Sequence, residues 1–259
     1  MSTADSYRRD GVVVARRILD EDQLGDLATA LDENLAAPGA WANDYTPAGS
    51  TGRFFGDYVN WARIEGYRRA ALHGPLARLA TELLDPPVRF FHEHALVKEA
   101  GTAEVTPWHH DEPYYCVDGV ENVSLWVPLD PVPAESGLRF VRGSHQWGRR
   151  FVPRRFLDAT PYAAADDGFE LVPDVDAIVA DDDIIGFDLE PGDVLAFHFR
   201  TLHDAPGAAA RRRAISFRYV GGDARFGSRP WLHSPPFDPI WPGEPLDDER
   251  FPEVAVAGR

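Results

Sequence analysis

The sequence predicts an α+β protein that is mostly β, with an antiparallel sandwich or barrel as its core. Helical periodicity is confined to the first third of the chain, and short apolar segments that alternate with a period of two follow it. With 22 prolines and 22 glycines, the chain has enough turn formers to join many short strands. No repeat with a period of roughly 20 to 50 residues is visible, which argues against a solenoid or a propeller. No linker divides the 259 residues, so we expect a single domain over residues 1–259.

The helical region begins with residues 20–37. Their apolar face consists of Leu24, Leu27, Leu31 and Leu35. Asp20 is the expected N-cap, and Pro38 and Gly39 mark the end. A loop is expected over residues 38–62, and helical patterns then continue to about residue 84 with an interruption near Pro75. An amphipathic helix of this kind should pack on a sheet.

Strands are expected after the Pro86-Pro87 pair. The candidate segments are residues 88–99, 105–115, 122–129, 138–143, 183–190, 193–199 and 213–221. The tail, residues 222–259, contains too much proline for regular structure and should wrap the surface.

Charge and composition exclude several function classes. The formal net charge of −16 repels nucleic-acid phosphates and anionic lipid, which makes a small molecule the expected partner. The N-terminal residues form no apolar signal segment and no apolar run is long enough for a membrane span, so we expect a cytoplasmic protein. Cys116 is the only cysteine, so a metal site would have to use histidine and carboxylate ligands.

The segment TPWHHDEPYY, residues 106–115, concentrates two histidines and two carboxylates at positions 109–112. On a strand, His109 and Asp111 would face one side, whereas His110 and Glu112 would face the other. A second histidine from a distant strand would complete a two-histidine, one-carboxylate set, which leaves coordination positions of iron(II) open. By itself the pair is weak evidence, because a His-x-Asp pair on a strand often arises by chance and more often has a structural or solvent-exposed role.

Two histidines in the segment 190–219 are candidates for the distal ligand. His198 and His203 lie five positions apart and cannot share a face of a regular strand, so only one should bind a metal. His203 precedes a loop of small residues that leads to Arg212. A guanidinium beside a metal ligand suits the far carboxylate of a dicarboxylic cosubstrate that chelates the metal.

At this point the chain resembles the phytanoyl-CoA dioxygenase family of iron(II)- and 2-oxoglutarate-dependent oxygenases. The resemblance runs from about Tyr7 to about Gly222. It rests on the order and spacing of TPWHHDEPYY, SLWVPLD, ESGLRFVRGSH, GDVLAFH and the interval from His203 to Arg212. It implies a double-stranded β-helix, or jelly roll, with the N-terminal helices packed on one sheet.

The resemblance also implies roles for individual residues. His109, Asp111 and His203 match the family's iron ligands, and Arg212 matches its 2-oxoglutarate-binding arginine. Trp126 and His94 match positions that line or contact the cosubstrate. Relatives carry serine where this chain has Ala205, so one cosubstrate hydrogen bond is missing or supplied from elsewhere.

The implied activity is oxidation of a C–H bond in a small organic molecule, as in secondary metabolism, with Fe(II), 2-oxoglutarate and O2 as cofactors. The outcome would be hydroxylation, or related ring closure, desaturation or epimerisation. The aspartate at position 111 implies an oxygenase, because related iron halogenases carry a small residue there. Two alternatives remain, namely a metal-binding jelly roll without turnover and a zinc hydrolase on the same ligands. The sequence leaves the substrate and the oligomeric state open.

Overall fold

The computed structural model describes residues 2–162 and 168–254. Its α-helices are α1 (Thr3–Asp10), α2 (Glu21–Ala36), α3 (Glu65–Leu72), α4 (Pro75–Leu83) and α5 (Val175–Ile178). Four short 3-10 helices are η1 (Glu112–Tyr114), η2 (Ala134–Ser136), η3 (Ser144–Gln146) and η4 (Asp181–Asp183). All but one of the α-helices therefore precede the main run of strands, as the sequence predicts.

Capping explains where the first two helices begin. The Asp20 side chain accepts a hydrogen bond from the backbone N–H of Gln23, and the Gln23 side chain accepts one from the Asp20 N–H. This capping box confirms the predicted start of α2. Ser2 and Asp5 form an equivalent box at α1, a helix that apolar periodicity does not reveal. Pro75 is tolerated because it occupies the first turn of α4.

The strands form two main antiparallel sheets and one short pair. Sheet order is β1-β10-β7-β12-β4-β3-β2 in the larger sheet, β5-β11-β8-β9 in the smaller one, and β13-β6 in the pair. The bounds are β1 (Val12–Ala15), β2 (Asn43–Asp44), β3 (Phe54–Tyr58), β4 (Arg89–Lys98), β5 (Thr106–His109), β6 (Val117–Asp118), β7 (Asn122–Pro128), β8 (Arg139–Val141), β9 (Ile184–Ile185), β10 (Val194–Phe197), β11 (His203–Ala205), β12 (Arg212–Val220) and β13 (Arg225–Phe226).

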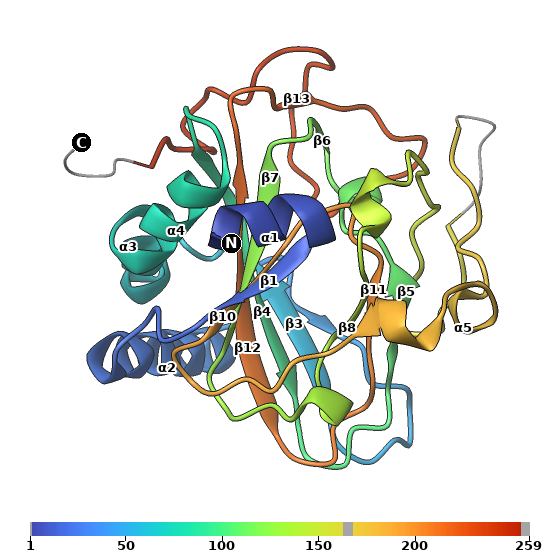
Figure 1. Cartoon of the computed structure of the whole chain (residues 1–259). Helices are drawn as coiled ribbons and strands as arrows, with labels where there is room; N and C mark the ends of the chain where they lie inside the picture. Colours follow the sequence, from blue (N-terminus) through green and yellow to red (C-terminus); the bar gives the residue numbers. More distant parts are fainter. Residues whose placement is uncertain (1, 163–167, 255–259) are drawn as a thin grey trace.

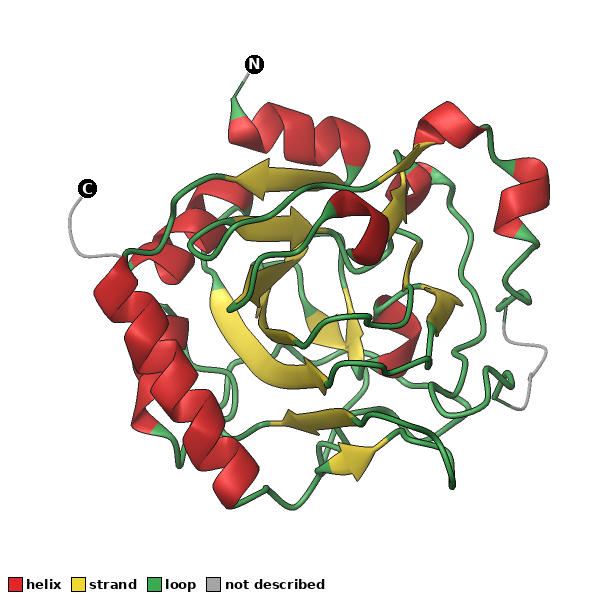
Figure 2. Cartoon of the chain, turned by 90° about the horizontal axis from the view of Figure 1, so that it is seen from below, coloured by secondary structure: helices red, strands yellow, loops and turns green. Residues whose placement is uncertain are grey.

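Helices α2, α3 and α4 cover one face of the larger sheet, whereas α5 lies beside the smaller sheet (Figure 1). Leu27 and Leu31 of α2 share a buried apolar cluster with Phe217 and Tyr219 of β12. The other face of this sheet is turned toward the smaller sheet, so that the strands curve around the centre of the molecule (Figure 2). Helices on one side of two facing antiparallel sheets are the predicted double-stranded β-helix.

The side chains of the central strands point alternately toward the apolar core and toward a cavity on the opposite face of the sheet. On β12, Ile215, Phe217 and Tyr219 pack toward the helices, whereas the residues between them line a cavity on the opposite face. The pairing of β12 with β4 shifts register after Arg218 and skips Phe91. Such a bulge re-aims neighbouring side chains.

Three expectations need correction. Residues 38–62 are not only a loop, because β2 and β3 extend the sheet beyond β4. The strand expected at 105–115 is only β5, which ends at His109, and Asp111 adopts helical backbone angles at the start of η1. The strand expected at 183–190 shrinks to β9. In the proline-rich tail, β13 is the one named strand among the described residues.

Among residues 2–162 and 168–254, no helix combines the length and the apolar character that crossing a bilayer would require.

Candidate metal centre

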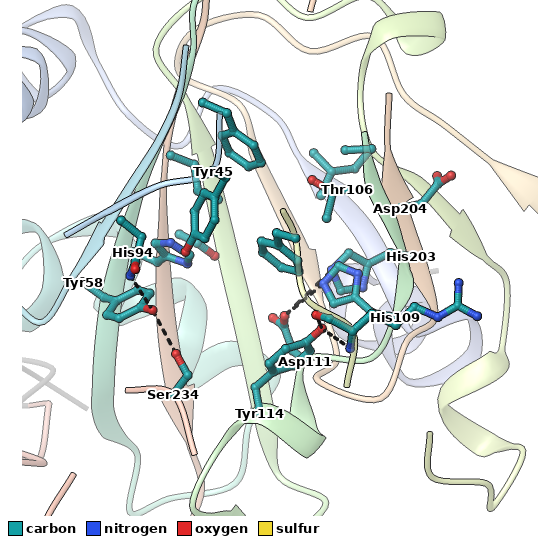
Figure 3. Close-up of a pocket in the computed structure, with 18 of the residues that line it drawn as sticks. Tyr45, Tyr58, His94, Thr106, His109, Asp111, Tyr114, His203, Asp204 and Ser234 are labelled. Atoms are coloured by element: carbon teal, nitrogen blue, oxygen red, sulfur yellow. Dashed lines mark hydrogen bonds and ion pairs between the residues drawn. The ribbon is translucent and has the colours of Figure 1, made fainter. Parts of the chain in front are cut away.

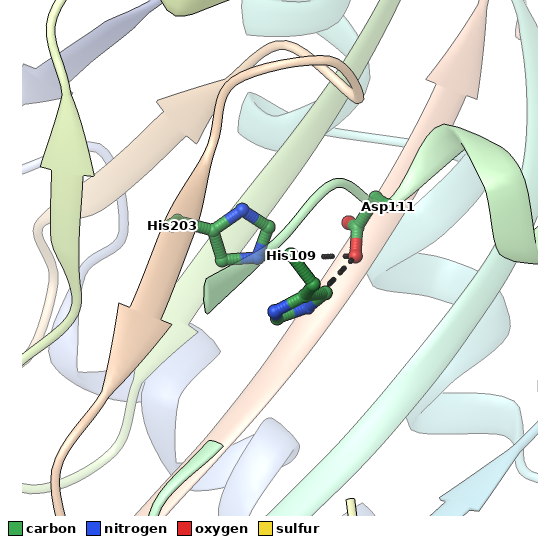
Figure 4. A group of neighbouring side chains, drawn as sticks. All are labelled: His109, Asp111 and His203. Atoms are coloured by element: carbon green, nitrogen blue, oxygen red, sulfur yellow. Dashed lines mark ion pairs between the residues drawn. The ribbon is translucent and has the colours of Figure 1, made fainter. Parts of the chain in front are cut away.

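His109, Asp111 and His203 come together at the facing ends of β5 and β11 (Figure 4). Their ligand atoms all lie within 4.8 Å of one another, and the three residues are buried. Asp111 Oδ1 is 3.8 Å from His109 Nε2 and 3.9 Å from His203 Nε2. His109 and His203 are direct partners in the β5-β11 register, and this pairing aligns the two rings. A short turn supplies the carboxylate in place of a continued strand.

Backbone carbonyls orient both imidazoles. His109 Nδ1 lies 2.8 Å from the Pro107 carbonyl oxygen, and His203 Nδ1 lies 2.8 Å from that of Thr201. A carbonyl can only accept, so each Nδ1 carries the proton and each Nε2 presents its lone pair to the centre. Burial, reinforced by His203, lowers the pKa of His109 to about 3, and burial also lowers that of His203. Both rings are therefore neutral at pH 7, as metal ligands must be.

Asp111 is ionised for a different reason. Burial would raise its pKa, but Arg218 and the two histidines outweigh burial and lower the pKa to about 2. Its Oδ2 accepts a hydrogen bond from Ser124 Oγ at 3.0 Å, and Arg218 Nη2 lies 3.4 Å away. Oδ1 is left for a metal. Two neutral nitrogens and one carboxylate oxygen fit iron(II), since this donor set leaves positions open for a chelating ligand.

A cavity of about 420 Å³ opens beside the three ligands. Figure 3 shows His109, Asp111 and His203 on one side of it, with Tyr45, Tyr58 and His94 on the other. Aromatic rings supply much of the wall; they belong to Tyr45, Phe54, Tyr58, Tyr114, Phe156 and Tyr162. The site thus combines polar ligands with an apolar surround, which is typical of small-molecule pockets.

All three residues expected to contact a cosubstrate line this cavity. Arg212 stands at the first position of β12, Trp126 lies on β7 and His94 on β4. Trp126 and His94 are both cross-strand partners of Ser216. Arg212 donates hydrogen bonds to the backbone carbonyls of Ser136 and Pro206, and burial lowers its pKa to about 10. The cavity therefore has a cationic end beside β11.

Lys98 is a second cation at this end that the sequence reasoning missed. It is the register partner of Arg212, and it is only 3 % exposed. Its ammonium donates to the carbonyls of Glu104 and Pro206 at 2.7 and 3.1 Å and pairs with no carboxylate among the described residues. Burial and the neighbouring Arg212 lower its pKa to about 7. Two facts available from the sequence pointed to it: it is the only lysine, and it lies an even number of residues from His94.

Thr106 faces the position where relatives carry serine. It pairs with Ala205 across the β5-β11 ladder and lines the cavity, as Figure 3 shows. Its hydroxyl is therefore available where Ala205 offers none.

The remaining polar residues of the motif point elsewhere. Glu112 is engaged by Arg150 at 2.7 Å, Arg200 at 3.5 Å and Arg229 at 3.6 Å. His110 packs on Phe151 and is absent from the lining of the cavity. The structure thus brings the predicted ligands together and places His110 and Glu112 away from them, although a turn rather than a strand does so.

His198 is not part of the centre. Its Nε2 bonds to the Val120 carbonyl, and its Nδ1 accepts the backbone N–H of Arg200. Both nitrogens are occupied, which agrees with the expectation that only one of the two distal histidines serves as a ligand.

The segment of residues 154–158 lines the cavity. The Phe156 ring lies 5.2 Å from that of His109, 5.9 Å from Tyr114 and 5.6 Å from Tyr45. Phe156 therefore bridges the two walls beside the ligands. Arg154 and Arg155 also line the cavity, although Arg155 is exposed.

The family model described as phytanoyl-CoA dioxygenase (PhyH) matches residues 7–214. No curated protein matches the chain. Among solved structures, the epimerase SnoN in complex with Fe³⁺, α-ketoglutarate and nogalamycin RO has a TM-score of 0.77 and 23 % identity, covering 98 % of this chain and 97 % of its own.

The non-heme α-ketoglutarate-dependent carbocyclase SnoK from nogalamycin biosynthesis has a TM-score of 0.77 and 24 % identity over 98 % of this chain and 95 % of its own. EctD from S. alaskensis, with 2-oxoglutarate and 5-hydroxyectoine, has a TM-score of 0.66 and 22 % identity over 93 % of this chain and 83 % of its own. At these identities the likeness establishes the shared fold.

Proposed function

The chain belongs to the phytanoyl-CoA dioxygenase family, and from this premise we propose that it is a non-haem iron(II) oxygenase that consumes 2-oxoglutarate and O2 to oxidise a C–H bond of a small organic molecule. The single observation that carries the proposal is the His109, Asp111 and His203 set, preorganised by Pro107 and Thr201, in a cavity that Lys98 and Arg212 also line. When bound, iron(II) with 2-oxoglutarate supplies the activation of O2, and the cosubstrate leaves as succinate and carbon dioxide.

In this proposal the ligand atoms are His109 Nε2, Asp111 Oδ1 and His203 Nε2. The two Nδ1–H groups hold the rings in place, so the site pays little reorganisation on metal binding. Ser124 retains the second carboxylate oxygen of Asp111, which favours a single-oxygen contact with the metal.

Lys98 and Arg212 would hold the far carboxylate of 2-oxoglutarate. Lys98 is buried and Arg212 half-buried, neither has a carboxylate partner among the described residues, and both already reach the Pro206 carbonyl, so their charges converge on one spot. A guanidinium fork and an ammonium together match a carboxylate better than a neutral ligand. The Thr106 hydroxyl would replace the serine that relatives use, and Trp126 and His94 would flank the cosubstrate.

Aromatic side chains would exclude water from the reacting carbon. Phe156 and Tyr114 lie against the His109 ring, and Tyr114 OH is fixed by the Arg154 backbone. Such shielding favours reaction with the bound substrate over reaction with water.

The outcome at carbon belongs to the same proposal. Hydroxylation is the default, while ring closure, desaturation or epimerisation would need only a different placement of the substrate. The names of two structural neighbours, a carbocyclase and an epimerase, support this range, and nogalamycin biosynthesis supports a substrate from secondary metabolism.

The test is oxygen-dependent conversion of 2-oxoglutarate to succinate in the absence of added substrate. NMR spectroscopy monitors the succinate that forms. We expect slow succinate formation with Fe(II) and none with Zn(II) or with Asp111→Ala. Equal absence of succinate with Fe(II) and Zn(II), together with hydrolysis of ester probes by the zinc form, would favour the zinc hydrolase.

A further inference from the structure

One group of polar side chains that lines the cavity would bind neither the metal nor the far carboxylate of 2-oxoglutarate. His92 and His94 on β4 are the register partners of Arg218 and Ser216 on β12. All four line the cavity and are at most 6 % exposed. They form one continuous polar patch at the opposite end of these strands from Lys98 and Arg212. Six residues of strand separate Arg212 from Arg218, or roughly 20 Å along the backbone.

Arg218 is the charged member of this patch, and it is incompletely paired. Its Nη2 lies 3.4 Å from Asp111 Oδ2, an oxygen that already accepts a shorter hydrogen bond from Ser124. The guanidinium carbon lies 5.4 Å from the centre of the Tyr115 ring. Neither Nε nor Nη1 has a hydrogen-bond partner among the described residues. A buried guanidinium with unused donors is costly, so a ligand that supplies acceptors would bind there with a large gain.

Apart from Asp111, the neighbours of Arg218 offer no compensating charge. Nδ1 of His92, Nε2 of His94 and Oγ of Ser216 also have no partner among the residues that the structure describes. Burial lowers the pKa of both histidines, so they are neutral at pH 7. They can donate or accept hydrogen bonds, but they cannot neutralise a cation.

The other carboxylates that line the cavity are engaged. Asp44 pairs with Arg53 at 2.9 Å, Asp204 pairs with Arg139, and Asp158 is bonded to Thr160. Asp111 would coordinate the metal, whose positive charge would offset that of the carboxylate. Among the described residues that line the cavity, Asp111 is therefore the one carboxylate paired with Arg218.

We propose that Arg218 anchors an anionic oxygen of the primary substrate, a carboxylate or a phenolate, beside the metal, with His92, His94 and Ser216 completing the hydrogen bonds. This rests on the proposed function, because it names the substrate class of the same site. Charge complementarity in a water-poor pocket would then decide which molecules enter, even though the acidic surface repels anions.

The test compares two probes of equal shape and different charge, 2-naphthoate and 2-naphthamide. Each is titrated anaerobically into the enzyme loaded with Fe(II) and saturating 2-oxoglutarate. The readout is the shift of the visible charge-transfer band of the chelated keto acid, with affinities checked by calorimetry. We expect naphthoate to bind roughly tenfold tighter or more, the range for a hydrogen bond to a charged group. In Arg218→Gln, loaded with Fe(II) and 2-oxoglutarate at concentrations that saturate this variant, the ratio should fall to about one.

Arg155→Gln is the matched control, because it removes an exposed arginine from the same cavity lining. It should keep the preference for naphthoate. Where Arg218→Gln fails to form the band, Arg218→Lys replaces it, and the preference should drop severalfold.

Four results overturn the proposal: equal affinities of the wild type for the two probes, a preference for naphthoate that remains in Arg218→Gln, an equal loss of this preference in Arg155→Gln, or loss of the band when naphthoate is added. The last result would mean that naphthoate competes for the cosubstrate site. Absence of the band in the wild type would instead contradict the proposed function.

Discussion

Individual residues set the protonation state of the three proposed metal ligands. The carbonyls of Pro107 and Thr201 fix the tautomers of the two histidines, and Arg218 with Ser124 holds Asp111 ionised. A metal would therefore meet ligands that need to release no proton at pH 7.

We predict that His109→Ala, Asp111→Ala and His203→Ala each weaken Fe(II) binding by roughly 100-fold or more, because each removes one of three ligands. His110→Ala should keep the wild-type affinity, since His110 packs on Phe151 outside the cavity. Anaerobic equilibrium dialysis with Fe(II) measures this. Equal metal loss in His110→Ala would show that the ligand assignment is wrong.

A second prediction concerns Lys98, whose pKa burial lowers to about 7. Above pH 7 the unliganded enzyme carries a neutral Lys98, whereas a bound carboxylate favours the ammonium. The affinity for 2-oxoglutarate should therefore fall as pH rises from 7 to 9, by at most about tenfold per unit.

Lys98→Met should bind 2-oxoglutarate weakly at pH 7 and lose most of this pH dependence, as titration at several pH values would reveal. An unchanged slope in Lys98→Met would remove the lysine from the cosubstrate site.

Residue patterns predicted part of the centre and missed the rest for physical reasons. The proposed ligands could be predicted because a metal demands particular residue types at particular spacings, and the structure brings these three residues together. Lys98 and Thr106 were missed because their meaning depends on which strands become neighbours, and β5, β11 and β12 pair over long distances in the sequence. Nothing local in the sequence distinguishes Arg218, because only the packed strands determine which buried donors lack partners.

At the scale of elements, prediction succeeded where the signal is local. Helix α2 starts at its capping box, and β4, β7, β10 and β12 agree with the expected strands to within one or two residues. By contrast, β1 and β3 are edge-side strands of four and five residues whose existence depends on pairing with β10 and β4. Short sequences do not encode such partners.

The cap of α2 gives a prediction at this scale. Asp20→Ala removes the acceptor for the Gln23 N–H and should lower the free energy of unfolding by about 1 kcal/mol. Iron and 2-oxoglutarate affinities should stay unchanged, because the helix covers the sheet face opposite the cavity. Urea unfolding measures the free energy of unfolding, and the charge-transfer titration measures the affinities for iron and 2-oxoglutarate. A large loss of cofactor affinity would contradict this separation of core and site.

At the scale of the whole molecule, residues 1–259 are predicted to unfold as one domain. The two main sheets share the site, since β5 and β11 supply ligands while β4 and β12 supply the cations. We therefore expect one cooperative thermal transition. Fe(II) with 2-oxoglutarate, at a hundredfold excess over Kd, should raise the free energy of unfolding by about 3 kcal/mol and so shift the transition to a higher temperature.

Calorimetry under anaerobic conditions measures this shift, with Asp111→Ala as the variant that should not respond. Two separate transitions, or an equal shift in Asp111→Ala, would argue against one domain organised around the metal.

The measurement that tests the account most directly is anaerobic titration of the metal-free protein, first with Fe(II) and then with 2-oxoglutarate. We predict a weak visible charge-transfer band that appears only when both are present, with a much higher 2-oxoglutarate midpoint in Arg212→Ala. Iron that binds without any band at saturating 2-oxoglutarate would contradict the assignment of this centre to 2-oxoglutarate chemistry.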